Sequence, residues 1–187
     1  KRGLEFFAAL VLIAVFSPLL LFIAALVKIT SRGSVIYRQV RVGRHGKEFV
    51  LYKFRTMVAD AEKNGAEWAR PKDARTTLLG RILRHSHCDE LPQLVNIVRG
   101  ELSFVGPRPE RPEFATMLAK KIPYYEIRHL VKPGITGWAQ VNFRYGASTQ
   151  ETHEKLQYDV YYLKNRSLVL DFAIILKTMR SFFVNNR

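Results

Sequence analysis

The sequence is poor in acidic residues and in cysteine. Only 16 Asp and Glu stand against 30 Lys and Arg in 187 residues, so the formal net charge is +14. Such a basic chain favours an anionic partner, which can be nucleic acid, anionic lipid or a phosphorylated substrate. The single Cys88 excludes an internal disulfide framework and is typical of a reducing compartment. The sequence has no internal repeat or low-complexity tract, and 48% apolar residues exclude a disordered tail and suit one domain with a core.

One long apolar run lies near the start of the chain. Residues 6–27 carry no charge and are interrupted only by Ser17 and Pro18. About twenty apolar residues suffice for a transmembrane helix, and hydropathy alone favours a straight membrane anchor. A cleaved signal peptide does not fit, because the run is too long and lacks an A-x-A-like end.

Charge and proline instead favour a helix that enters and leaves the membrane on one side. Basic residues flank both ends of the run (Lys1, Arg2, Lys28, Arg32 and Arg38), and such flanks prefer the cytoplasm. Pro18 kinks the helix into arms of about 18–22 Å, too short for a core of about 30 Å. Ser17 can bond a carbonyl freed at the break. We therefore predict a re-entrant helix–break–helix at residues 1–30 and a cytoplasmic domain at residues 31–187.

The remaining chain predicts an α+β domain. Residues 35–57 alternate around a Gly43–Gly46 turn, which indicates a β-hairpin. Helices are expected at residues 78–83, 91–98, 114–130 on both sides of Pro123, and 151–164, with a helix and mobile loop at 59–73. Residues 132–141 read as a loop entering a strand. An apolar stripe predicts a helix at residues 167–183, which either packs in the core or lies in the membrane surface.

Two adjacent carboxylates, Asp89 and Glu90, stand just before Pro92. Proline is tolerated in the first turn of a helix, so the helix is expected to begin near Cys88 or Asp89. A helix N-cap with an acidic neighbour is the ordinary explanation of this pair, and spacing alone favours it. The alternative is chemical: an ionised Asp can attack phosphorus, and its neighbour can help to hold Mg²⁺.

Arg108 lies between Pro107 and Pro109, which bias the backbone to an extended shape. Its planar guanidinium matches phosphate oxygens. A plain proline-rich loop is the simpler explanation of the motif in isolation. Further basic residues could clamp phosphate, although some must be merely solvated: Lys53, Arg55, Arg75, Arg81 and Arg84.

The cluster His85, His87 and Cys88 suggests zinc, but no second ligand pair completes a tetrahedral set. A basic nucleic-acid-binding module would explain the net charge, yet the sequence contains no recognised nucleic-acid motif. We expect no nucleic-acid partner. A structural scaffold subunit is the third possibility, and a homo-oligomer remains open.

Taken together, these residues resemble the bacterial sugar transferase family, the monotopic polyprenyl-phosphate phosphoglycosyl transferases. The resemblance runs through nearly the whole chain. It is carried by KRGLEFFAALVLIAVFSPLLLFIAALVKI, GSVIYRQVRVG, YKFRTM, DARTTLLGRILR, DELPQLVNIVRGELSFVGPRP, KPGITGWAQVN and YDVYYLKNRSLVLDFAIILKT. Chance agreement of so many ordered blocks is very improbable.

The resemblance implies a membrane enzyme. It would transfer a sugar 1-phosphate from a UDP-sugar to polyprenyl phosphate, release UMP, use Mg²⁺ and initiate exopolysaccharide synthesis at the bacterial inner membrane. Asp89 would be the nucleophile, Glu90 would assist with the metal or the lipid phosphate, and Arg108 would bind phosphate. Ser17 and Pro18 match the family's membrane break. The predicted substrate-binding set is Lys53, Arg55, Arg84, Arg108 and Gln140.

Two departures from the family pattern matter. Cys88 stands where the family usually has Leu or Ile, for which we expect local repacking. Residues 143–146 differ from the Gly-Arg that often follows WAQVN. Because this part is expected near the nucleotide-sugar pocket, the identity of the sugar cannot be transferred.

Overall fold

The computed structural model describes residues 1–58, 60–61, 73–143 and 149–184. Most of the predicted helix and loop at 59–73 and most of the 143–146 departure lie outside these residues. The chain order is α1 (Arg2–Thr30), β1 (Ile36–Val42), 3₁₀ helix η1 (Arg44–Gly46), β2 (Glu48–Phe54), α2 (Leu78–His85), 3₁₀ helix η2 (Cys88–Gln93), α3 (Leu94–Arg99), β3 (Ser103–Val105), α4 (Pro112–Lys121), 3₁₀ helix η3 (Tyr125–Leu130), β4 (Gly134–Thr136), α5 (Trp138–Asn142), α6 (Thr149–Asn165) and α7 (Leu168–Val184).

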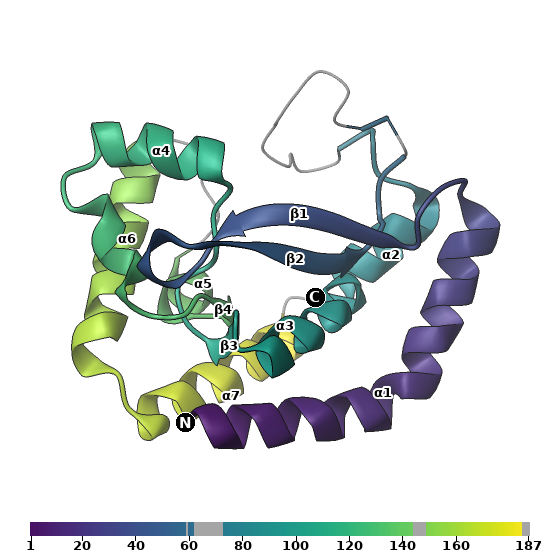
Figure 1. Cartoon of the computed structure of the whole chain (residues 1–187), viewed down its shortest axis with the longest axis horizontal. Coiled ribbons are helices and arrows are strands. Elements are labelled where there is room, and N and C mark those ends of the chain that lie inside the picture. Colours follow the sequence, from purple (N-terminus) through teal and green to yellow (C-terminus); the bar gives the residue numbers. More distant parts are fainter. Residues whose placement is uncertain (59, 62–72, 144–148, 185–187) are drawn as a thin grey trace.

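Helix α1 is sharply bent. In Figure 1 its first arm runs along the lower edge of the molecule, and its second arm turns upward beside α2. Pro18 lacks the N–H that would bond the carbonyl of Ala14, and the Ser17 hydroxyl donates to that carbonyl at 2.8 Å. The predicted kink and its Ser17 hydrogen bond are therefore confirmed.

Both arms of α1 pack on the rest of the protein. Ala9 in the first arm is buried with Leu94 and Ile97 of α3, and Val27 in the second arm is buried with Phe54 and Leu83. Most other apolar side chains of α1 are exposed. By length and composition α1 is the one helix in the described part of the chain that could cross a membrane, and only 11% of its most apolar window is buried.

Ion pairs and hydrogen bonds fasten the two ends of α1. At the N-terminal end, Lys1 Nζ lies 2.7 Å from a carboxylate oxygen of Asp171 on α7 and donates to the Tyr162 hydroxyl at 3.1 Å. At the C-terminal end, Arg55 donates to the backbone carbonyl of Ser31 at 2.8 Å and to its hydroxyl at 2.7 Å. The bent helix is therefore held to the domain at both ends.

Strands β1 and β2 form the predicted antiparallel hairpin, with Ile36 opposite Phe54 and Val42 opposite Glu48. The turn needs left-handed backbone at His45 (φ 57°) and Gly46 (φ 74°), which a glycine adopts without strain. Strands β3 and β4 form a second, parallel pair. This mixture of helices and small sheets confirms the α+β class.

Most predicted helices are present, and the predicted loop entering a strand at 132–141 is correct only in its first half. Only Gly134–Thr136 is extended, and the chain then turns into α5. Strand β4 and its partner β3 are each three residues long. Two side chains then bond nearby carbonyls: Gln140 Nε2 donates to Ile135 O, and Asn142 Nδ2 to Trp138 O, both at 2.8 Å.

Helix α7 has two distinct faces. Asp171 and Ile174 are buried in the protein. The apolar stripe found in the sequence lies elsewhere on the helix and is largely exposed: Leu168, Phe172, Leu176 and Met179 are each at least half exposed. The stripe therefore does not form the core-packing face of α7.

Candidate active site

The carboxylate pair stands at a sharp turn between α2 and α3. Thr77 caps α2 by accepting a hydrogen bond from the Gly80 amide at 2.9 Å. After α2 the chain passes through His87, whose φ is 55°, and η2 then begins at Cys88. The predicted start of a helix at this point is confirmed. Asp89 is not its N-cap, because His87 holds that position.

Glu90 lies between two cations. Its carboxylate is 2.6 Å from Lys53 Nζ on β2 and 3.2 Å from a guanidinium nitrogen of Arg108. Burial alone would raise the pKa of Glu90, but the charges of Arg108 and Lys53 outweigh that effect and lower the pKa to about 2. Glu90 is therefore ionised at neutral pH and is fixed in place.

Asp89 lies in a different environment. It is 7% exposed, and its carboxylate has no hydrogen bond or ion pair with another described residue. Burial raises its pKa, although the charge of Lys53 acts against this. Adjacent carboxylates thus differ: Glu90 is held by cations, and Asp89 is buried without such a partner in the described part of the chain.

The structure brings some of the predicted substrate-binding residues to the pair. Lys53 and Arg108 contact Glu90 directly, and the charge of Arg84 acts on Asp89. The Arg84 guanidinium donates to the hydroxyls of Thr56 at 2.9 Å and Thr76 at 3.3 Å.

The other two predicted residues are placed differently. Arg55 is turned away toward Ser31 at the end of α1. Gln140 lines a cleft beside the pair, with its Nε2 on Ile135 and its buried Oε1 without a hydrogen-bond partner among the described residues. Arg55 is therefore the one member of the predicted set that the structure holds at the C-terminal end of α1.

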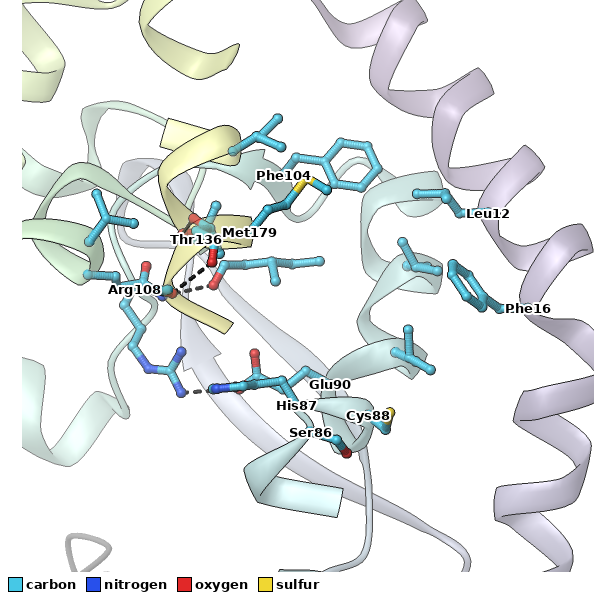
Figure 2. Close-up of a pocket in the computed structure, with 18 of the residues that line it drawn as sticks. Leu12, Phe16, Ser86, His87, Cys88, Glu90, Phe104, Arg108, Thr136 and Met179 are labelled. Carbon is cyan, nitrogen blue, oxygen red and sulfur yellow. Dashed lines mark hydrogen bonds and ion pairs between the residues drawn. The ribbon is translucent and has the colours of Figure 1, made fainter. Parts of the chain in front are cut away.

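A cleft of about 1170 Å³ opens between α1, η2 and α7. One part of its wall is polar and includes His87, Glu90, Arg108 and Gln140. Figure 2 shows Arg108 pointing toward Glu90, with Leu12 and Phe16 of α1 on the opposite side. Most of the remaining wall is apolar and includes Ala8, Leu12, Phe16, Leu19, Leu91, Leu94, Phe104, Ile135, Ile175 and Met179.

The two carboxylates are placed differently relative to this cleft. Glu90 and Cys88 line it, whereas Asp89 does not. Cys88 is half-buried and packs against the buried cluster that contains Ile23, Phe54 and Leu83. The local repacking expected around Cys88 stays a prediction.

The model of the bacterial sugar transferase family matches residues 1–185. The chain belongs to this family. The UDP-N-acetylgalactosamine-undecaprenyl-phosphate N-acetylgalactosaminephosphotransferase of Aeromonas hydrophila is 45% identical over 97% of this chain and 43% of its own length. The UDP-glucose:undecaprenyl-phosphate glucose-1-phosphate transferase of Escherichia coli (strain K12) is 39% identical over 99% of this chain and 40% of its own length.

A shorter relative is also similar. The uncharacterized sugar transferase EpsL of Bacillus subtilis (strain 168) is 41% identical over 99% of this chain and 88% of its own length. The chain thus spans less than half of the first two relatives and most of the third. The family predicted from the sequence blocks is confirmed, and it is a family of enzymes.

The carboxylates of this bacterial sugar transferase suit one particular way of binding Mg²⁺. No group of three or more His, Cys, Asp or Glu in the described ranges could hold a metal alone. Mg²⁺ is usually bound by one or two carboxylates together with substrate phosphates. Asp89, which has no cationic partner among the described residues, and the adjacent Glu90 fit that mode of binding.

Sequence reasoning missed a buried cluster behind the site of this sugar transferase. Arg128 and Asp159 are 3% and 2% exposed and form an ion pair at 2.8 Å. The sequence does indicate this cluster, because Leu156, Asp159 and Tyr162 recur at a helical spacing on α6. All three side chains are buried in the structure. An acid on such a face requires a buried partner.

Proposed function

We propose that this protein transfers a sugar 1-phosphate from a UDP-sugar to a polyprenyl phosphate such as undecaprenyl phosphate and releases UMP. The observation that carries the proposal is the cleft. Its polar part offers Arg108 and Gln140 to a phosphate or sugar, and its apolar part offers Leu12 and Phe16 to a lipid chain. An amphiphilic lipid phosphate requires this combination. The names of the relatives, with UDP-sugars and undecaprenyl phosphate in them, support the same reaction.

In the first step, the Asp89 carboxylate attacks the β-phosphorus of the UDP-sugar. A bond forms between the Asp89 oxygen and phosphorus, and the bond from phosphorus to the bridging oxygen breaks. UMP leaves with the electron pair, and an aspartyl phosphosugar remains. Burial withdraws Asp89 from water, so its anion attacks with less solvent to displace.

In the second step, a phosphate oxygen of the polyprenyl phosphate attacks the same phosphorus. The bond to Asp89 breaks, the carboxylate is regenerated, and a polyprenyl diphosphate sugar is released. Arg108, with Lys53 beside it, holds the phosphate oxygens, and Glu90 orients these two cations. Mg²⁺, held by Asp89 and Glu90, would screen the charge between the two anions that must meet.

The membrane placement is also a proposal. The two short arms of α1 would enter and leave the cytoplasmic leaflet as a re-entrant helix at residues 1–30. Residues 31–187 would lie on the cytoplasmic face of the inner membrane, with the exposed apolar face of α7 in the interface. Three observations support this: the bend at Pro18, the exposed apolar surface of α1, and the attachment of both its ends to one domain.

The reaction is tested by intact mass and UMP release. Purified protein in nanodiscs is mixed with UDP-glucose, UDP-galactose or UDP-N-acetylgalactosamine without lipid acceptor. We expect a phosphosugar adduct on the wild type, no adduct on Asp89→Asn, and a normal adduct on the exposed control Glu113→Gln. An undiminished adduct on Asp89→Asn would exclude Asp89 as nucleophile. If the wild type releases no UMP from any UDP-sugar even with undecaprenyl phosphate, the proposed reaction is wrong.

The topology is tested by cysteine labelling. Gly3→Cys and Ser31→Cys are introduced separately into a Cys88→Ser background and treated with a membrane-impermeant maleimide. A re-entrant helix predicts that both positions react only from the cytoplasmic side. Reaction from opposite sides would replace it with a spanning helix.

A further inference from the structure

The loop that carries Arg108 is held through its backbone carbonyls. Pro107 and Pro109 have no N–H to donate, so carbonyl oxygens are the main backbone groups by which this loop can be fixed. Four successive carbonyls accept hydrogen bonds: Pro107 O from the Gly134 amide at 3.0 Å, Arg108 O from Arg128 Nη2 at 3.0 Å, Pro109 O from Arg41 Nη1 at 2.8 Å and Glu110 O from the Val42 amide at 2.9 Å. Two of these four donors are arginine side chains.

Arg128 is the more deeply buried of the two arginines. Its Nε donates to Asp159 at 3.0 Å, its Nη2 lies 2.8 Å from the same carboxylate, and its Nη1 donates to the Tyr125 hydroxyl at 2.6 Å. A carboxylate oxygen of Glu110, at the end of the loop, lies 3.8 Å from Arg128 Nη1. The guanidinium is thus fixed on several sides, and the bond from its Nη2 to Arg108 O reaches a site residue.

Stability alone does not explain such a cluster. A buried ion pair loses most of its Coulomb energy to desolvation, and apolar residues of the same volume often stabilise a core equally well. An apolar side chain could not donate to Arg108 O, whereas a planar guanidinium held by Asp159 can do so in a fixed direction. The cluster therefore has a use that packing would not supply.

The opposite end of Arg108 lies in the site. Its backbone is bonded to Arg128, and its guanidinium reaches Glu90 at 3.2 Å and lines the cleft, as Figure 2 shows. A displacement of the loop carbonyl would move the guanidinium relative to Glu90. Misplacement of a catalytic group by about 1 Å can cost on the order of 100-fold in rate.

We propose that Arg128, held by Asp159, is a positioning residue that sets the direction of Arg108 by bonding its backbone carbonyl. This inference rests on the proposed function, in which Arg108 binds the substrate phosphate. Arg41 acts on the next carbonyl of the loop in the same way.

A double-mutant cycle on the turnover number tests the inference. Arg128→Lys keeps the charge beside Asp159 but cannot reach Asp159, Tyr125 and Arg108 O together. We expect it to lower kcat for UMP release by about 10- to 100-fold in the wild-type background. In the Arg108→Lys background, the same change should cost less than about twofold, because the clamp that it positions is already lost. The exposed control Arg38→Lys should leave both backgrounds unchanged.

Two outcomes of this cycle would overturn the inference, and a second variant covers the case in which the first does not fold. An equal fold-loss from Arg128→Lys in both backgrounds overturns the inference, because the residue then acts on the fold and not through Arg108. If Arg108→Lys leaves kcat unchanged, the phosphate-binding role of Arg108 and the inference fall together. If Arg128→Lys does not fold, as judged by circular dichroism, Arg41→Lys is carried through the same cycle. Additive losses there overturn the positioning of the loop, and non-additive losses support it.

Discussion

Neutralising the two adjacent carboxylates should change stability in opposite directions. The pKa of Glu90 is lowered from 4.5 to about 2, which corresponds to about 3 kcal/mol of stability at neutral pH. Because the folded-state pKa is lowered, this contribution is complete above pH 4.5 and is lost as the pH falls toward 2. Asp89 behaves in the reverse sense. Its raised pKa means that ionisation costs stability, so the cost is absent below pH 3.8 and grows as the pH rises through the folded-state pKa.

The assay is thermal unfolding of Glu90→Gln and Asp89→Asn in one detergent with EDTA, followed by tryptophan fluorescence. For a chain of this size about 3 kcal/mol corresponds to roughly 6–12 °C in Tm. At pH 7 we expect the Tm of Glu90→Gln to be lower than that of the wild type by that amount. We expect the Tm of Asp89→Asn to be higher than that of the wild type. The difference between Glu90→Gln and wild type should narrow as the pH is lowered below 4.5.

Two results would refute this reasoning. Shifts of the same sign in both variants at pH 7 would contradict the different environments of the two carboxylates. A difference in Tm between Glu90→Gln and the wild type that does not narrow at low pH would contradict the lowered pKa of Glu90. Replacing EDTA with Mg²⁺ provides a linked check, since binding at the pair should raise the Tm of the wild type and not that of Asp89→Asn.

Three other substitutions test the bend of α1 and its attachment to the domain, each by thermal unfolding. Ser17→Ala should cost about 1 kcal/mol, because the carbonyl of Ala14 then has neither the Pro18 amide nor a hydroxyl to bond; no change would mean that water replaces the bond. Asp171→Asn should cost about 1.5–3 kcal/mol by removing the ion pair with Lys1 and weakening the bond from Tyr162, and a neutral result would argue against this attachment of α1. Arg55→Gln should cost about 2 kcal/mol through two lost hydrogen bonds; a raised KM for UDP-sugar with unchanged stability would instead support the substrate contact predicted from the sequence.

Local chemistry explains why much of the fold could be predicted. Alternation around Gly43 and Gly46 is sufficient to define the hairpin, since the turn itself needs left-handed backbone. Pro18 and Ser17 lie side by side in the sequence, so the bend and the hydrogen bond that accompanies it are both local events. The failure at 132–141 is not local. The strand at Gly134–Thr136 pairs with β3, which lies about thirty residues earlier in the chain, so its extent is not recorded in the local sequence.

The same distinction applies to the site. Asp89, Glu90 and Arg108 could be found because their neighbours in sequence (Pro92, Pro107 and Pro109) restrict the backbone. The partners that give them their properties lie far away: Lys53 is 37 residues from Glu90, and Arg128 is 20 residues from Arg108. Sequence spacing carries no record of such pairings, so the opposite pKa shifts of Asp89 and Glu90 required the structure.

The core shared between α1 and the rest of the protein affects the order in which the chain folds during synthesis. Ala9 and Val27 are buried against Ile97 and Leu83, which are translated many residues later. With α1 in the membrane, as proposed, the helix would meet lipid before these partners exist, and the last folding steps would take place against the bilayer. Expression of residues 31–187 alone would leave Leu83 and Ile97 uncovered. A water-soluble version of this enzyme would therefore require polar substitutions at these positions as well as removal of the helix.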